Sequence, residues 1–154
     1  MNDIYFSIYN NLIKLTRNKN LYNINKTDTF YDRMIIFFFH LGLLLKVHKN
    51  IEKKDNLQKF FDYSVRQIEL SIREIGYGDA TINKKMKNYI NLLFSIIDKI
   101  DKWEKMDSVQ KIEIFKIYIS DLNNNEYYVE YFDKYVLFLR KNTFKNLSKD
   151  IITL

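Results

Sequence analysis

The sequence predicts an all-α protein: a single domain over residues 1–154, built as a bundle of about six helices. The chain has no proline and only three glycines, so it lacks the turn residues that β-sandwiches, β-barrels and Rossmann-type folds require. Hydrophobic residues make up 47% of the chain, which is enough to bury a core, and 154 residues is the length of one ordinary domain. The fold class that remains is an all-α fold built from long helices with few breaks.

The first helix is expected near the N-terminus, behind a cap at Asn2 or Asp3. Its apolar residues recur at helical spacing: Ile4, Ile8, Leu12 and Leu15. The polar stretch 17–27 is expected to be a connection, with some local order around Leu21, Tyr22 and Ile24.

A second helix is expected over residues 30–48, with Asp28 or Thr29 as its cap. It contains the longest apolar stretch, Met34–Leu45, which is too short to cross a bilayer because a spanning helix needs about 20 residues. A central helix buried on nearly all sides is the favoured interpretation, and a helix partly inserted in a membrane interface is the alternative. His40, inside this stretch, is expected to be a core histidine with a hydrogen-bonded proton.

A third and a fourth helix are expected on either side of the link 76–79, packed antiparallel. Asp55 is expected to cap the third helix, and Gly76 to end it by taking the left-handed conformation. Asp79 is expected to cap the fourth. The apolar stripe of the third helix, the face expected to pack on the core, consists of Leu57, Phe61, Ser64, Ile68, Ile72 and Ile75. That of the fourth is Ile82, Met86, Tyr89, Ile90, Leu93, Ile97 and Ile100.

The segment 101–106 interrupts the helical pattern, and a fifth helix is expected behind Asp107 or Ser108. Its inward residues would be Val109, Ile112, Phe115, Ile119 and Leu122. Apolar residues also alternate at short range within 111–119, which leaves a strand as the alternative. After a turn at 123–125, a sixth helix carries Tyr128, Phe132, Tyr135 and Leu139 inward.

The composition argues against an enzyme. The chain has no cysteine, which excludes disulfides, thiol nucleophiles and cysteine-ligated zinc. His40 and His48 are eight residues apart, too far for two ligands of one metal on a helix. No serine or carboxylate stands in a recognisable nucleophile or acid–base setting. We therefore expect neither a catalytic residue nor a metal or other cofactor.

Three lysines, Lys84, Lys85 and Lys87, fall in the first two turns of the expected fourth helix. The helix dipole is positive there, so cations are slightly unfavourable. One interpretation is a patch that faces an anionic surface, such as a membrane headgroup layer or ribosomal RNA. The other is a solvated face in a lysine-rich chain with a net charge of +6.

Aromatic residues come in adjacent runs, and one helix face cannot bury adjacent residues. The runs are Phe37–Phe39, Phe60 with Phe61, and Tyr127, Tyr128, Tyr131 and Phe132. Some of these rings must therefore face a second surface, either a neighbouring helix or a groove for an apolar segment of another protein. A helix buried all round is favoured for the first run, and the residues of 127–132 are candidates for client contacts.

The block 69–87 resembles the most recognisable stretch of the ubiquinol–cytochrome c chaperone family. It carries an Arg-Glu pair followed by Gly-x-Gly-Asp, formed here by Arg73, Glu74, Gly76, Gly78 and Asp79. The basic segment with Lys84, Lys85 and Lys87 is similar to the one that follows in the family. Residues 28–46, 57–62 and 139–144 also resemble family segments, although the arginine often found near 93–96 is absent and Lys141 replaces another.

This resemblance implies an all-α assembly chaperone of ubiquinol–cytochrome c reductase, respiratory complex III. The implied client is newly made cytochrome b, and the ribosome tunnel exit or a second assembly factor would be further partners. Peripheral contact with an anionic membrane surface is compatible with it, and DNA is not expected. A basic helical module that binds nucleic acid or the ribosome, without a chaperone role, is the alternative.

The resemblance also implies a location. The first twenty residues fit neither a secretory signal nor a transit peptide, which favours a bacterial protein in the cytoplasm, peripheral to the inner membrane. In a eukaryote the corresponding place would be the matrix side of the mitochondrial inner membrane.

Overall fold

The computed structural model describes residues 2–22, 29–120, 122–149 and 154. These residues form six α-helices and three short 3₁₀-helices and contain no strand, which confirms the predicted all-α fold. The α-helices are α1 (Asn2–Thr16), α2 (Phe30–His48), α3 (Lys54–Glu74), α4 (Asp79–Lys99), α5 (Ser108–Tyr118) and α6 (Asn125–Lys141). The 3₁₀-helices are η1 (Lys19–Leu21), η2 (Trp103–Lys105) and η3 (Lys145–Ser148). Residues 111–119 are therefore helical over most of their length, and the strand alternative is wrong.

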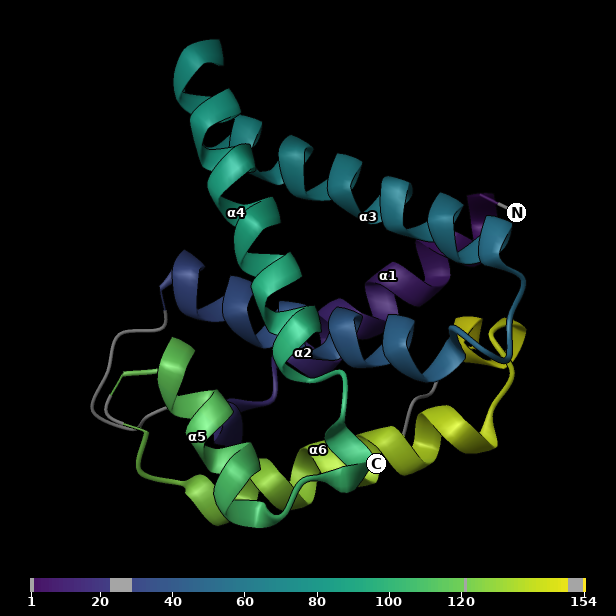
Figure 1. The fold of residues 1–154 in the computed structure, drawn as a ribbon. Helices are drawn as coiled ribbons and strands as arrows, with labels where there is room; N and C mark the ends of the chain where they lie inside the picture. The colour runs from purple at the N-terminus through teal and green to yellow at the C-terminus, as the bar shows by residue number, and fades with distance from the viewer. Residues whose placement is uncertain (1, 23–28, 121, 150–153) are drawn as a thin grey trace.

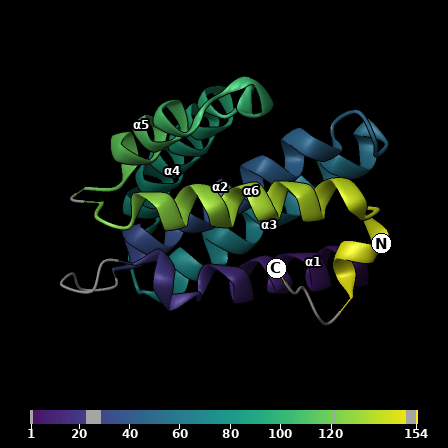
Figure 2. The same cartoon turned by 90° about the horizontal axis from the view of Figure 1, so that it is seen from below.

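Helix α2 lies at the centre of the bundle and packs against α1, α4 and α6 (Figure 1). Helix α6 lies alongside α2, between α1 and α5 (Figure 2). Every residue from Met34 to Leu44 is buried, because neighbouring helices cover different sides of α2. The three adjacent rings of Phe37–Phe39 are each at most 3% exposed. The interpretation as a central buried helix is confirmed, and the interface-inserted alternative is wrong.

No helix in the described part of the chain combines the length and the apolar character needed to span a membrane.

Two of the predicted caps are present. The Thr29 hydroxyl accepts a hydrogen bond from the Asp32 backbone amide at 3.1 Å, and Asp32 accepts one from the Thr29 amide in return. Asp107 and Gln110 form the same reciprocal arrangement at the start of α5. Each capping box satisfies two backbone donors that a helix start would otherwise leave unpaired. The alternative cap Asp28 lies outside the described residues, as does Ile24.

The caps predicted at the other helix starts are wrong. Helix α1 already includes Asn2 and Asp3, and α3 begins at Lys54, so Asp55 lies inside its first turn. Asp55 pairs instead with Lys59 one turn later, at 3.0 Å. The N-cap of α4 is Gly78, without a side-chain hydrogen bond, and Asp79 is the first helical residue. The acidic side chains remain in the first turns, where the helix dipole favours them.

The predicted stripes are right in period but shifted in two helices. In α3 the buried phenylalanine is Phe60, whereas Phe61 is half-buried and Ile75 is 51% exposed. In α5 Val109 is 68% exposed, and the buried face consists of Lys111, Ile114, Phe115 and Tyr118. Helix α5 packs mainly on α6, and its buried rings also meet Phe39 of α2, so the opposite side, with Val109, stays exposed.

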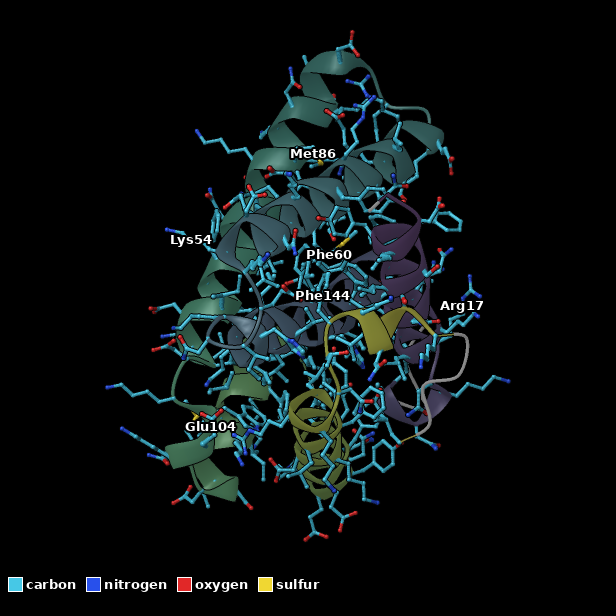
Figure 3. The ribbon with its side chains drawn as sticks, turned by 90° about the vertical axis from the view of Figure 1, so that its right-hand side faces the viewer. Arg17, Lys54, Phe60, Met86, Glu104 and Phe144 are labelled. Carbon is cyan, nitrogen blue, oxygen red and sulfur yellow. The ribbon has the colours of Figure 1, made fainter. Side chains whose placement is uncertain are left out.

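The C-terminal segment closes the bundle over α1 and α3. The Asn11 side-chain amide donates hydrogen bonds to the carbonyls of Leu147 and Lys149, at 2.9 and 2.7 Å. Phe144 reaches into the interior and meets Phe60 edge-on, with ring centroids 5.5 Å apart (Figure 3).

The C-terminal end of α3 and the N-terminal end of α4 are joined by a short link, so the two helices form a hairpin. Away from the link the helices diverge toward the rest of the bundle (Figure 1). The end of this hairpin, residues 70–88, extends beyond the other helices, and we call it the α3–α4 arm. Every residue from Arg73 to Thr81 is exposed. Ile82 of the α4 stripe is fully buried, whereas Met86, Tyr89 and Ile90 are half-buried. The Tyr89 ring, just beyond the arm, meets Phe30 and Phe38 of α2, with centroids 6.2 and 6.4 Å apart.

The link depends on one glycine. Gly76 has a φ of +99°, as its predicted helix-ending role requires, whereas Gly78 has a φ of −71°. We expect Gly76→Ser to lower the free energy of unfolding by about 1–2 kcal/mol, because a side chain is strained at positive φ. The matched control Gly78→Ser should be neutral or slightly stabilising, because serine is a good N-cap residue. Urea unfolding of both variants measures this, and equal stabilities would contradict the role given to Gly76.

Candidate functional site

The aromatic residues of α6 predicted to contact a client lie mostly in the core. Tyr128, Tyr131 and Phe132 are 1%, 7% and 0% exposed. The Phe132 ring packs against Phe39 and His40, with centroids 5.8 and 5.1 Å apart. The physical reason is that α6 is covered by α2 on one side and by α5 on another. Tyr128 and Phe132 therefore form no client surface in this structure, which corrects the interpretation made from the sequence. Tyr131, although only 7% exposed, lines a surface pocket with Tyr127.

Tyr127 is the fourth residue of that set and is half-buried. Its hydroxyl accepts a hydrogen bond from the Asn18 side-chain amide at 2.8 Å, and its ring stacks on Tyr131. This contact ties α6 to the segment that follows α1. Tyr127 and Tyr131 line a pocket of about 260 Å³ between α1 and α6, and their role as client contacts stays a prediction.

His40 is fully buried, as predicted. Its Nδ1 lies 2.8 Å from the Ile36 carbonyl oxygen and its Nε2 lies 2.7 Å from the Tyr131 hydroxyl. A carbonyl can only accept, so Nδ1 carries the proton and Nε2 accepts from Tyr131. Burial lowers the pKa of His40 to about 4 despite the hydrogen bond to Ile36. His40 is thus a neutral core histidine whose two nitrogens are both satisfied.

Glu104, in η2, links helices α2 and α6 through two ion pairs. It accepts from Lys46 of α2 at 2.8 Å and from Arg140 of α6 at 2.7 Å. Partial burial acts to raise its pKa, but the hydrogen bonds from these two cations prevail and lower the pKa to about 2. This carboxylate is held by its ion pairs as a structural link. Across the described residues, no group of three histidine, aspartate or glutamate side chains could hold a metal ion.

The motif residues of the link have structural contacts on the arm. The Arg73 guanidinium donates to Asp79 at 2.8 Å and lies 3.8 Å from Glu69, so it bridges the end of α3 and the start of α4. Gly76 and Gly78 are exposed and supply the backbone of the turn, and Glu74 is exposed beside them.

The three lysines predicted as a docking patch follow on the same arm. Lys84 and Lys87 are exposed, and Lys85 is half-buried with its Nζ 4.6 Å from the centre of the Tyr77 ring. None of the three makes an ion pair with any residue that the structure describes. The structure thus brings Lys85 next to an exposed aromatic ring, which sequence reasoning did not foresee.

An apolar groove of about 410 Å³ lies between α2, α3 and α4. It is lined by Leu45, Lys49, Lys54, Leu57, Gln58, Phe61, Phe94 and Ile97. Phe61 and Phe94 stack across it, with centroids 5.8 Å apart and planes 24° apart, and Phe94 remains 52% exposed. The adjacent pair Phe60–Phe61 indicated that one ring faces a second surface, but the sequence did not show that Phe94 would join it.

The rim of the groove is basic at one end. Lys54 points away from the body (Figure 3) and makes no ion pair with a described residue. Lys49 lies 3.6 Å from Asp101, and both side chains are more than half exposed, so this ion pair contributes little. The groove therefore combines an apolar floor with a cationic edge.

Comparison with known proteins places the chain in a family. No curated protein and no solved structure matches it. The family model described as Ubiquinol-cytochrome C chaperone matches residues 23–108, which is more than half of the 154 residues. The matched region includes α2, α3 and α4, and with them both the arm and the groove. The chain therefore belongs to the ubiquinol–cytochrome c chaperone family.

Proposed function

We propose that this protein is an assembly chaperone of ubiquinol–cytochrome c reductase that binds newly made cytochrome b as its client. The observation that carries the proposal is the family match over residues 23–108. A chaperone acts by binding a client protein, and the sequence resemblance points to cytochrome b as that client.

The groove between α2, α3 and α4 is the surface that we propose for the client. Its lining side chains are mainly apolar, and its volume of about 410 Å³ is in the range of about 300–1,000 Å³ typical of binding pockets. A groove of this kind fits the apolar face of a helical segment. Lys49 and Lys54 at its edge favour a segment that ends in a carboxylate or in the negative end of a helix dipole.

The place of action is part of the same proposal. In a bacterium we expect the protein in the cytoplasm, peripheral to the inner membrane, and in a eukaryote on the matrix side of the mitochondrial inner membrane. The ribosome tunnel exit and a second assembly factor are further proposed partners. The exposed lysines of the arm are our candidates for docking.

A charge placed in the groove tests the client site. We expect Phe94→Asp to lower the yield of cytochrome b captured from a detergent-solubilised lysate by roughly 30-fold, because a central aromatic contact of an interface contributes about 2 kcal/mol or more. Phe94 is 52% exposed, so the fold should tolerate the change. Capture on the tagged protein, followed by immunoblotting for cytochrome b, gives the measurement.

Val109→Asp provides the matched control. Val109 is 68% exposed and lies on α5, outside the groove lining, so the same charge there should leave capture unchanged. Equal capture by both folded variants would show that the client binds elsewhere. If the wild-type protein itself retains no cytochrome b, the proposed client is wrong.

A further inference from the structure

The tip of the α3–α4 arm, residues 73–81, lies outside the hydrophobic core. It extends beyond the bundle, and its residues from Arg73 to Thr81 are all exposed (Figure 1). Ile72 and Ile82 are buried where the two helices meet, and Ser71, Lys85 and Met86 are half-buried, while the other side chains of the arm are exposed. The exposed tip of this projecting element is available for binding.

The arm carries a cationic excess that the protein itself does not neutralise. Residues 70–88 contain four cations, Arg73, Lys84, Lys85 and Lys87, and two anions, Glu74 and Asp79, which gives a net charge of +2. Arg73 and Asp79 pair with each other. The three lysines lie in the second and third turns of α4 and remain without an ion pair to any described residue, so the repulsion among them is not compensated. An external anionic surface would relieve this repulsion.

Exposed apolar side chains lie on the same arm. Leu70, Ile75 and Tyr77 are 37%, 51% and 41% exposed. The Tyr77 ring lies against the Lys85 ammonium, at 4.6 Å from Nζ to the ring centre. Lysine beside aromatic and aliphatic side chains is the combination that enters the headgroup layer of a membrane. Nucleic-acid backbones are bound mainly through contacts with phosphates, and an exposed isoleucine would make no favourable contact there.

We infer that the α3–α4 arm binds the surface of an anionic phospholipid bilayer, with Ile75 and Tyr77 in the headgroup layer and Lys84, Lys85 and Lys87 against the lipid phosphates. This rests on the proposed function, since it names the surface at which the chaperone docks. The binding is peripheral and reversible, because a few lysines and two apolar side chains provide a weak anchor.

Vesicle sedimentation tests the charge contribution. The full chain should bind vesicles of phosphatidylglycerol and phosphatidylcholine at low salt, bind pure phosphatidylcholine weakly, and dissociate as salt is raised. The triple variant K84Q/K85Q/K87Q should bind the anionic vesicles roughly 100-fold more weakly, because each lysine near such a surface contributes about a five-fold factor. The control K102Q/K105Q/K116Q removes the same charge from exposed lysines far from the arm and should bind nearly as the wild type does.

The apolar contribution distinguishes lipid from RNA. The double variant I75S/Y77S keeps all charges, and we expect it to bind anionic vesicles about 10-fold more weakly while its sedimentation with ribosomes is unchanged. Tyr77→Trp should show a blue-shifted emission when anionic vesicles are added, because the indole leaves water. The existing Trp103 is buried and at the other end of α4, so its emission should not change.

Three results would overturn the inference. The first is equal vesicle binding by K84Q/K85Q/K87Q and by the control triple variant. The second is vesicle binding by I75S/Y77S that equals that of the wild type. The third is a K84Q/K85Q/K87Q variant that loses ribosome binding but keeps its binding to anionic vesicles. Capture of cytochrome b from a detergent-solubilised lysate does not require a bilayer, so it is measured on the same variants. Failure of the membrane contact is thereby separated from failure of the proposed client.

Discussion

Replacing Phe132 with alanine is expected to lower the free energy of unfolding by about 3–5 kcal/mol, the usual cost of truncating a buried phenylalanine. The side chain is 0% exposed, and its ring packs against Phe39, His40 and Phe115 at centroid distances of 5.8, 5.1 and 5.4 Å. Alanine would leave a cavity where α2, α5 and α6 meet. Urea unfolding followed by circular dichroism measures the loss.

The control is Leu137→Ala on the same helix. Leu137 is 49% exposed, so its truncation should cost only about 0.5 kcal/mol. A near-neutral Phe132→Ala would mean that this ring does not contribute to the core, and it would revive the interpretation of Phe132 as a client contact. The comparison thus decides between the two roles that the aromatic run on α6 allows.

Acidification is expected to destabilise the fold through His40. The pKa of this buried imidazole is about 4 in the folded protein, below its ordinary value of 6.5. Between these values the unfolded chain takes up a proton that the folded protein does not, so stability falls as the pH falls. The loss from this group should reach about 2 kcal/mol at pH 5 and about 3 kcal/mol at pH 4.

His40→Gln tests this directly, because glutamine does not titrate. The variant is expected to be less stable at neutral pH, and its stability should depend less steeply on pH between 7.5 and 5. His48 also has a pKa lowered by burial, but it is present in both proteins and cancels in the comparison. Glu104, whose pKa is lowered to about 2 in the folded protein, is likewise present in both proteins and cancels. Parallel pH profiles for the two proteins would show that His40 is protonated, or accessible, in the folded state.

Local sequence rules predicted the existence and order of the helices. Thr29 and Asp107 supply capping boxes through neighbours only three residues away, so these helix starts depend on short-range chemistry. Gly76 ends α3 because glycine alone takes a φ of +99° without strain. Met34–Leu45 is apolar on every side, so burial was expected whichever way the helix turned. His40 could be assigned to the core for the same reason.

The tertiary structure decided which face of each helix is covered. Phe60 and Phe61 are adjacent, and the spacing of the stripe does not reveal which one faces α1 and which one joins Phe94 in the groove. The run from Tyr127 to Phe132 is consistent with either a surface or a core, and the outcome depended on α2 and α5 covering both sides of α6. Asp79 pairs with Arg73 because the turn brings the end of α3 back to it.

The sequence by itself thus determined that this protein is helical, the approximate limits of most helices, and which segment lies at its centre. These features depend on dihedral preferences, caps and helical periodicity, which act over a few residues. The groove around Phe94, the juxtaposition of Lys85 with Tyr77 and the burial of Tyr131 were decided only by the tertiary structure. Each of them requires the relative placement of two or three helices, and periodicity fixes the repeat of a helix but not the direction in which its neighbours lie.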